Sequence, residues 1–214
     1  DFHVHTQFAY CSQNMDIPKS VEVAREFGLA GLSLTEHSGQ LYFDAPTYWG
    51  AKWLRDGMEC ATGRSNRAED FFAQAMQYSP PASIGLEIDC DAHGRPVVRD
   101  EDFDRAQVRI GAVHPLENRS DPNEAAREVL ARLEQFLGCG IDILAHPLRE
   151  FARAKLDPPP EIVPKLVRLL RKHGVAAEIN FHINEPTAEF VTQCLEAKIK
   201  LNLKNNSHNL YKIN

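Results

Sequence analysis

The first side chains with an evident capacity for chemistry are two histidines, His3 and His5. On a β-strand successive side chains point to opposite faces, so these two would share one face while Phe2 and Val4 turn toward packing on the other. Two imidazoles aimed at one point suit a divalent metal such as zinc, manganese or iron. A half-buried strand that carries two histidines by chance would give the same pattern, so the rest of the chain has to separate the two interpretations.

More side chains of the ligating kind follow later apolar runs, each at the point where a predicted strand ends. They are His37, Glu87, His114, His146 and His208. In a (β/α) barrel the carboxyl ends of the strands meet on one face, where the active site forms. A doubly wound open sheet would gather strand ends only near its switch point. The recurrence at successive strand ends therefore favours a barrel with one shared polar site.

Apolar β-branched runs alternate with amphipathic stretches along the chain. The pattern predicts about seven strands, within residues 1–6, 32–35, 83–89, 108–113, 141–145, 175–179 and 200–203. Helices are predicted over residues 17–27, 122–137, 161–173 and 187–197, with one long helix or two over 51–77. Such alternation implies a parallel sheet covered by helices, and the length fits a single domain over residues 1–214.

The composition is that of a soluble globular protein, because 43% of the 214 residues are hydrophobic and 25% are charged. The net charge of −6 argues against non-specific binding to nucleic acid or to an anionic membrane, and no apolar run reaches the roughly 18 residues of a membrane span. The five cysteines are scattered and form no CxxC, which predicts a reducing, cytoplasmic location. Since the chain opens on Asp1 rather than Met, we expect its native start to be missing. The oligomeric state stays open.

Short motifs follow one another in a fixed order over nearly the whole chain. They are Asp1–Thr6, Thr35–His37, Gly85–Ile88, Ala112–His114, Ala145–Pro147, Glu178–Asn180 and Asn206–His208. Taken in this order, they resemble the PHP family, the polymerase and histidinol phosphatase domain. The resemblance implies an α/β fold of the distorted (β/α)7 TIM-like barrel type. It also implies a site for two or three metal ions and, as in many members, hydrolysis of phosphoesters.

The resemblance further implies which residues hold the divalent ions, which would be zinc, manganese or iron. A first ion is expected at His3, His5, Glu87 and the position of Asn206. A second is expected at Glu87, His114 and His146. A third is expected at His37, His208 and a residue soon after the opening motif.

Two positions depart from the family pattern. The terminal aspartate of the family is Asn206 here, which offers a carbonyl oxygen but no charge and cannot act as a general base. We therefore expect the first site to be weaker or completed by water. The early ligand of the third ion is also missing, and Cys11 stands about where it belongs. A thiolate suits zinc, but a packed or free cysteine would look the same in the sequence.

The predicted chemistry centres on Glu87, which lies on an apolar strand where a carboxylate is costly unless it is paired or ligating. Two bridged cations about 3.5–4 Å apart can activate a water to hydroxide and stabilise the attacking and leaving oxygens. Arg149, just after the Ala145–Pro147 motif, could bind two phosphate oxygens through its guanidinium, although a solvated surface arginine is the alternative. We expect the catalytic residues to be Glu87, His37, Arg149 and His208.

Two local features have two interpretations each. Glu36 either orients His37 as a supporting carboxylate or lies on the surface. The aromatic loop over residues 42–49 is either a lid over a substrate or an apolar plug at the barrel rim.

The leading hypothesis is a metal-dependent hydrolase, a phosphoesterase that acts on a small organic phosphate through metal-activated hydroxide, similar to a histidinol phosphatase. A PHP-like module that binds metal but is catalytically impaired is the first alternative, and Asn206 supports it. A metal-dependent amidohydrolase with a non-phosphorylated substrate is the second. An exonuclease is less favoured, because the sequence shows no basic groove for a nucleic-acid backbone.

Overall fold

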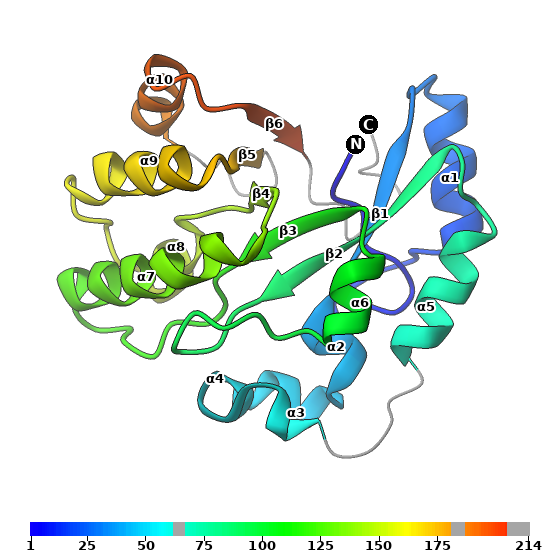
Figure 1. The fold of residues 1–214 in the computed structure, drawn as a ribbon, viewed down its shortest axis with the longest axis horizontal. Coiled ribbons are helices and arrows are strands. Elements are labelled where there is room, and N and C mark those ends of the chain that lie inside the picture. Colours follow the sequence, from blue (N-terminus) through cyan, green and yellow to red (C-terminus); the bar gives the residue numbers. More distant parts are fainter. Residues whose placement is uncertain (62–66, 181–186, 205–214) are drawn as a thin grey trace.

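A computed structural model describes residues 1–61, 67–180 and 187–204, with side chains as far as residue 202. Its centre is a parallel sheet (Figure 1). The strands are β1 (Leu32–His37), β2 (Ala82–Asp89), β3 (Val108–Ala112), β4 (Ile143–Leu144), β5 (Ala176–Asn180) and β6 (Leu201–Lys204). Each strand pairs with the next one in the chain, in the order β1-β2-β3-β4-β5-β6. This is the strand order of a TIM-like barrel, and the α/β class predicted from the sequence is confirmed.

The strand predicted at residues 1–6 is shortened to a single bridge, so the described sheet has six strands rather than seven. Val4 pairs in parallel with Leu34 through hydrogen bonds from Val4 N to Ser33 O (3.2 Å) and from Thr35 N to Val4 O (2.8 Å). Pairing ends because the chain turns at Thr6, whose backbone N–H and hydroxyl both donate to the Glu36 carboxylate. The opening segment still occupies the place beside β1 that a first strand would have.

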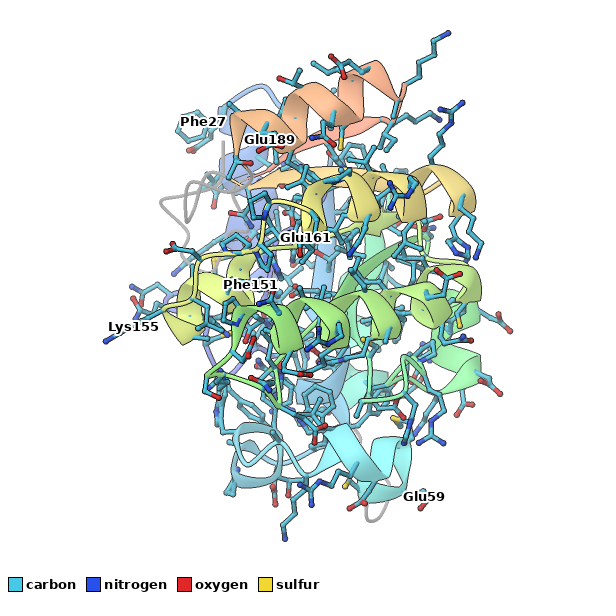
Figure 2. All side chains as sticks on the ribbon, turned by 90° about the vertical axis from the view of Figure 1, so that its left-hand side faces the viewer. Phe27, Glu59, Phe151, Lys155, Glu161 and Glu189 are labelled. Carbon is cyan, nitrogen blue, oxygen red and sulfur yellow. The ribbon has the colours of Figure 1, made fainter. Side chains whose placement is uncertain are left out.

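A helix precedes each strand in the chain, and these helices cover the outside of the sheet. They are α1 (Ile17–Glu26), α5 (Arg67–Met76), α6 (Asp100–Arg105), α7 (Pro122–Phe136), α9 (Ile162–His173) and α10 (Ala188–Glu196). Figure 2 shows α7, α9 and α10 lying as one layer over this side of the molecule. A side-chain cap fixes the start of α7, where the Asp121 carboxylate accepts from the backbone N–H groups of Asn123 and Glu124. Gly174, with φ +69°, ends α9.

A second set of short helices follows the carboxyl ends of β1 and β4. After β1 come α2 (Ser38–Tyr42), α3 (Ala45–Trp49), α4 (Trp53–Asp56) and the 3-10 turn η1 (Gly57–Cys60), and after β4 comes α8 (Arg149–Ala154). Residues 51–77 were predicted as one helix or two, and the described part holds α4, η1 and α5. The segment predicted as an aromatic loop is largely helical. Tyr42, Phe43 and Tyr48 are buried there, which favours the plug, while Trp49 is 57% exposed.

No helix in the described residues is both long enough and apolar enough to span a bilayer.

Candidate metal centre

The Glu87 carboxylate, fully buried near the carboxyl end of β2, has a set of imidazoles on each of its oxygens. Oε2 lies 3.3 Å from His3 Nε2, 3.3 Å from His5 Nε2 and 2.8 Å from His37 Nδ1. Oε1 lies 2.9 Å from His146 Nε2 and 4.0 Å from His114 Nε2. The ligand atoms of two trios lie within 4.8 Å of one another, His3–His5–Glu87 and Glu87–His114–His146. The carboxylate therefore stands between two candidate ion positions.

The strands explain why these side chains converge. His37 ends β1 and is the register partner of Glu87 on β2. His114 and His146 follow β3 and β4, which are the next two strands of the sheet. His3 and His5 flank Val4, whose bridge to Leu34 holds the opening segment beside β1. A parallel sheet brings all of its carboxyl ends to one edge, so residues spread over 144 positions of sequence meet there.

Three of the five histidines have a carboxylate on the ring nitrogen that faces away from Glu87. The Nδ1 atom of His3 lies 3.0 Å from Glu178 Oε1, that of His5 lies 3.3 Å from Glu36 Oε1, and that of His114 lies 2.9 Å from Asp89 Oδ1. A carboxylate partner holds the proton on Nδ1 and leaves the Nε2 lone pair for a metal ion. This is the arrangement that orients metal-ligating histidines in other proteins.

The fit of these residues to a cation can be tested on two buried atoms, His3 Nε2 and Glu87 Oε2. Neither makes a hydrogen bond of acceptable geometry, although they lie only 3.3 Å apart. With the His3 proton on Nδ1, both atoms present lone pairs to each other, and two facing acceptors are unfavourable when buried. A positive charge between them, either a proton or a metal ion, removes the conflict. The donor set of imidazoles and one shared carboxylate fits a divalent transition metal.

The charge balance of the metal-free protein agrees with this test. Burial lowers the pKa of His3, but the carboxylates of Glu178 and Glu87 outweigh it and raise the pKa to about 9. Burial likewise opposes ionisation of Glu87, but His37 and His3 hold the pKa of that carboxyl well below its usual range. Burial and Arg149 lower the pKa of His146 to about 4, so this histidine is neutral and needs no further proton loss to ligate. In the absence of a metal ion, a proton on His3 supplies the positive charge between His3 and Glu87.

Arg149, at the start of α8, is buried and its Nη2 lies 2.6 Å from His114 Nε2. A guanidinium only donates, so His114 Nε2 is an acceptor and its Nδ1 carries the proton toward Asp89. Burial and the Arg149 charge hold the pKa of His114 well below its ordinary value. An ion in the Glu87–His114–His146 trio needs this same lone pair. Ion binding and the Arg149–His114 contact therefore exclude each other.

Glu178 connects the two trios. Its Oε1 faces His3, and its Oε2 accepts a hydrogen bond from the His146 backbone N–H at 3.1 Å. His146 has φ +27°, a conformation that costs a non-glycine residue on the order of 1–3 kcal/mol. The contact with Glu178 helps to hold that backbone, and with it the direction in which the imidazole points.

Supporting carboxylates are where the sequence interpretation fell short. The Glu36 carboxylate lies 3.3 Å from His5 Nδ1 through its Oε1, and it accepts from the His37 backbone N–H at 3.0 Å. It is buried, so the surface interpretation was wrong. Asp89 was not predicted to take part, although it lies two residues after Glu87 and so shares its face of β2. Glu178 was noted only as part of a motif. Its role depends on how β5 curves toward residue 3, which no local pattern reveals.

Three more residues were predicted from the sequence to take part in the metal site: Asn206, His208 and Cys11. Asn206 and His208 lie outside the described residues. Cys11 lies at the margin of the centre, where its Sγ is 3.6 Å from Gln40 Nε2. Burial raises the pKa of the Cys11 thiol to about 11, which keeps it protonated in the metal-free protein. Cys11, His37, His114 and Arg149 all line a cavity of about 990 Å³ that opens above the imidazoles.

Comparisons with known proteins agree with this fold. No curated protein sequence matches the chain. Among solved structures, one described as that of a presumed histidinol phosphatase, hisK from Listeria monocytogenes, superposes with a TM-score of 0.69 at 15% sequence identity. The match covers 100% of this chain and 96% of that chain, and at this identity it shows a shared fold. The family model of the PHP domain matches residues 1–182. The chain therefore belongs to the PHP domain family.

Proposed function

We propose that the protein is a metal-dependent phosphoesterase that hydrolyses a small organic phosphate at the Glu87 centre. Membership of the PHP family supports a metal-dependent hydrolase of phosphoesters in general. The observation that carries the proposal is the placement of Glu87, whose two oxygens each face a separate set of imidazoles. Such a bridging carboxylate is the usual core of two-metal hydrolytic sites.

The proposed ligands follow from the geometry. His3, His5 and Glu87 would hold one ion, and Glu87, His114 and His146 a second. A third would involve His37, with His208 and Cys11 as its proposed partners. Imidazole-rich sets suit zinc, manganese or iron. Ions bound here supply a water of lowered pKa and neutralise charge that develops on phosphate oxygens.

The chain's own residues then have distinct tasks. Glu87 would set the separation of the two ions, while Glu178, Glu36 and Asp89 hold three imidazoles in an orientation suited to ligation. Arg149 would give up its contact with His114 to an ion there, and as a residue of the cavity lining its guanidinium could bind phosphate oxygens. His37 faces both Glu87 and the cavity, so it is placed to contact the substrate or a third ion.

The finer class that we propose is a phosphoric monoester hydrolase of the histidinol-phosphatase type. The shared fold with the Listeria protein supports this type, as do the family motifs. All five cysteines are free, which supports a reducing, cytoplasmic location for the enzyme. Asn206 is the feature that favours the catalytically impaired alternative, because it removes one anionic ligand from the first ion.

Turnover of 4-nitrophenyl phosphate by the full chain tests the proposal. The protein is stripped with a chelator and then reloaded separately with Mn²⁺, Zn²⁺ and Fe²⁺. We expect activity that chelation abolishes and at least one of the ions restores. Substitution Glu87→Gln should abolish it, while Glu134→Gln on the exposed face of α7 should not. Tight metal binding without turnover would support the impaired module, and turnover of a cyclic amide instead would support the amidohydrolase.

A further inference from the structure

The cavity above the metal centre has two chemically different walls. Its apolar wall is aromatic and aliphatic, formed by Tyr48, Trp49, Trp53, Leu54 and Leu116. The other wall carries three arginines, Arg119, Arg149 and Arg153. No aspartate or glutamate is found among the described residues that line the cavity. This is an environment for an anion joined to a flat or apolar group.

Two of the arginines are arranged by one buried carboxylate. Arg119, in the loop before α7, has its Nη2 3.6 Å from Glu150 Oε2, and Arg153 on α8 has its Nη1 3.1 Å from Glu150 Oε1. The Glu150 side chain is only 5% exposed, whereas those of Arg119 and Arg153 are 53% and 52% exposed. Glu150 thus places two guanidiniums at the cavity margin and compensates one of their two charges. Each guanidinium has five N–H donors, so most of them remain for a ligand.

The positive charge exceeds what one reacting phosphate needs. That phosphate would be bound by the metal ions and by Arg149, the arginine nearest to the imidazoles. Among the hydrogen bonds and ion pairs of the described residues, those of Arg119 and Arg153 go to Glu150 and do not reach Glu87 or its imidazoles. Their position at the outer part of the same cavity suits a second group of the substrate.

We propose that Arg119 and Arg153 bind a second anionic group, so that the substrate is an organic phosphate that also carries a carboxylate or another phosphate. This inference rests on the proposed phosphoesterase function and names the substrate class. The part of the molecule between the two anions packs against the aromatic wall, where Trp49 is exposed and meets Tyr48 edge-on with ring centroids 5.0 Å apart. A leaving group with a free ammonium, histidinol included, is disfavoured, because the described cavity lining offers it arginines and no carboxylate. The histidinol-phosphatase type proposed above would then hold for the fold and the monoester chemistry, and the substrate would differ.

Three aryl phosphates that differ in the charge of the para position test the inference with the metal-loaded full chain. They are phenyl phosphate, 4-carboxyphenyl phosphate and 4-(aminomethyl)phenyl phosphate. We expect kcat/KM to be highest for the carboxylated compound, by about tenfold or more over phenyl phosphate, and lowest for the aminomethyl compound. Arg119→Gln and Arg153→Gln should each lower kcat/KM for the carboxylated compound about tenfold and leave that for phenyl phosphate within about twofold.

Controls separate charge recognition from folding. Arg127→Gln removes an exposed arginine of α7 that pairs with Glu124 and lies outside the cavity lining, so it should leave all three rates unchanged. The conservative variant Arg119→Lys keeps a positive charge beside Glu150 and leaves the Glu150–Arg153 pair in place. It should retain most of the preference for the carboxylated compound that Arg119→Gln loses.

The outcomes distinguish this inference from the proposed function. If phenyl phosphate is hydrolysed but the carboxylated compound is no better, or if the arginine variants lower both rates equally, the second anion site is refuted while the phosphoesterase stands. A preference for the aminomethyl compound would also refute it. If none of the three compounds is hydrolysed with any ion, the proposed function itself fails.

Discussion

His3 Nδ1 lies 3.0 Å from Glu178 Oε1, although 175 positions of sequence separate the two residues. His3 belongs to the opening segment beside β1, and Glu178 belongs to β5 near the other end of the sheet. The contact therefore shows that the sheet curls far enough to bring its two sides together. The same carboxylate accepts from the His146 backbone, so the curl of the sheet and the orientation of two candidate ligands depend on one side chain.

Glu178→Gln should weaken metal binding without unfolding the protein. Both atoms that face this carboxylate, His3 Nδ1 and His146 N, are donors, and a glutamine amide has only one acceptor oxygen for them. Loss of such a supporting group costs about 10–100-fold in metal affinity. Titration of the stripped protein with Mn²⁺ measures the change. Glu189→Gln in the first turn of α10 is the matched control, and equal affinities for the two variants would contradict the role given to Glu178.

Arg132 should be a structural support of the centre. Its side chain is 1% exposed, and it donates from Nη1 to Pro115 O at 2.8 Å and from Nη2 to Cys90 O at 2.6 Å and to His114 O at 3.4 Å. Arg132→Met would leave these buried carbonyls without a donor, and we expect it to lower the free energy of unfolding by about 3 kcal/mol. Urea denaturation checks this.

Arg127→Met, on the exposed side of the same helix, provides the comparison and should change the free energy of unfolding by less than about 0.5 kcal/mol. A denaturation midpoint for Arg132→Met that matches the midpoint of Arg127→Met would show that the carbonyls find other partners.

Metal affinity should rise with pH over the neutral range. Burial lowers the pKa of His3, but Glu178 and Glu87 raise it to about 9, so below that pH the metal-free protein holds a proton that an ion must displace. Burial also lowers the pKa of His5, but Glu36 and Glu87 raise it above its ordinary value, so this second ligand of the same ion adds to the effect. Apparent affinity for the ion at His3 and His5 should then increase at least about tenfold for each pH unit below 9, with at least one proton released on binding. His146, whose pKa is about 4, adds no pH dependence in this range. Calorimetric titration in two buffers of different ionisation enthalpy counts the protons, and binding without proton release would contradict the assignment.

Most of the candidate ligands were accessible from the sequence because they follow the geometry of the backbone. The spacing of His3 and His5 and the placement of His37, His114 and His146 after apolar strands suffice to bring them to one edge of a parallel sheet. Each of these features is visible in a short stretch of sequence, and the parallel sheet brings the residues together.

The remaining features could not be predicted because they depend on contacts between distant segments or on elements too short to carry a pattern. Glu178 meets His3 only because the sheet curls. The short helices α2 and α3 have five residues each, below the length at which helical periodicity is visible or a helix is stable alone. The first strand was predicted too long because the hydrogen bonds from Thr6 to Glu36, which turn the chain, are a tertiary contact.

The most direct test of the central claim is a crystal structure of the Mn²⁺-loaded protein with anomalous scattering measured at the manganese edge, for the wild type and for Glu87→Gln. We predict two strong anomalous peaks in the wild type. One should lie within coordination distance of His3, His5 and Glu87, and the other within coordination distance of Glu87, His114 and His146. The Glu87→Gln variant should lose at least one of them. Wild-type crystals with no anomalous peak between these side chains, or with peaks that persist unchanged in Glu87→Gln, would contradict the account.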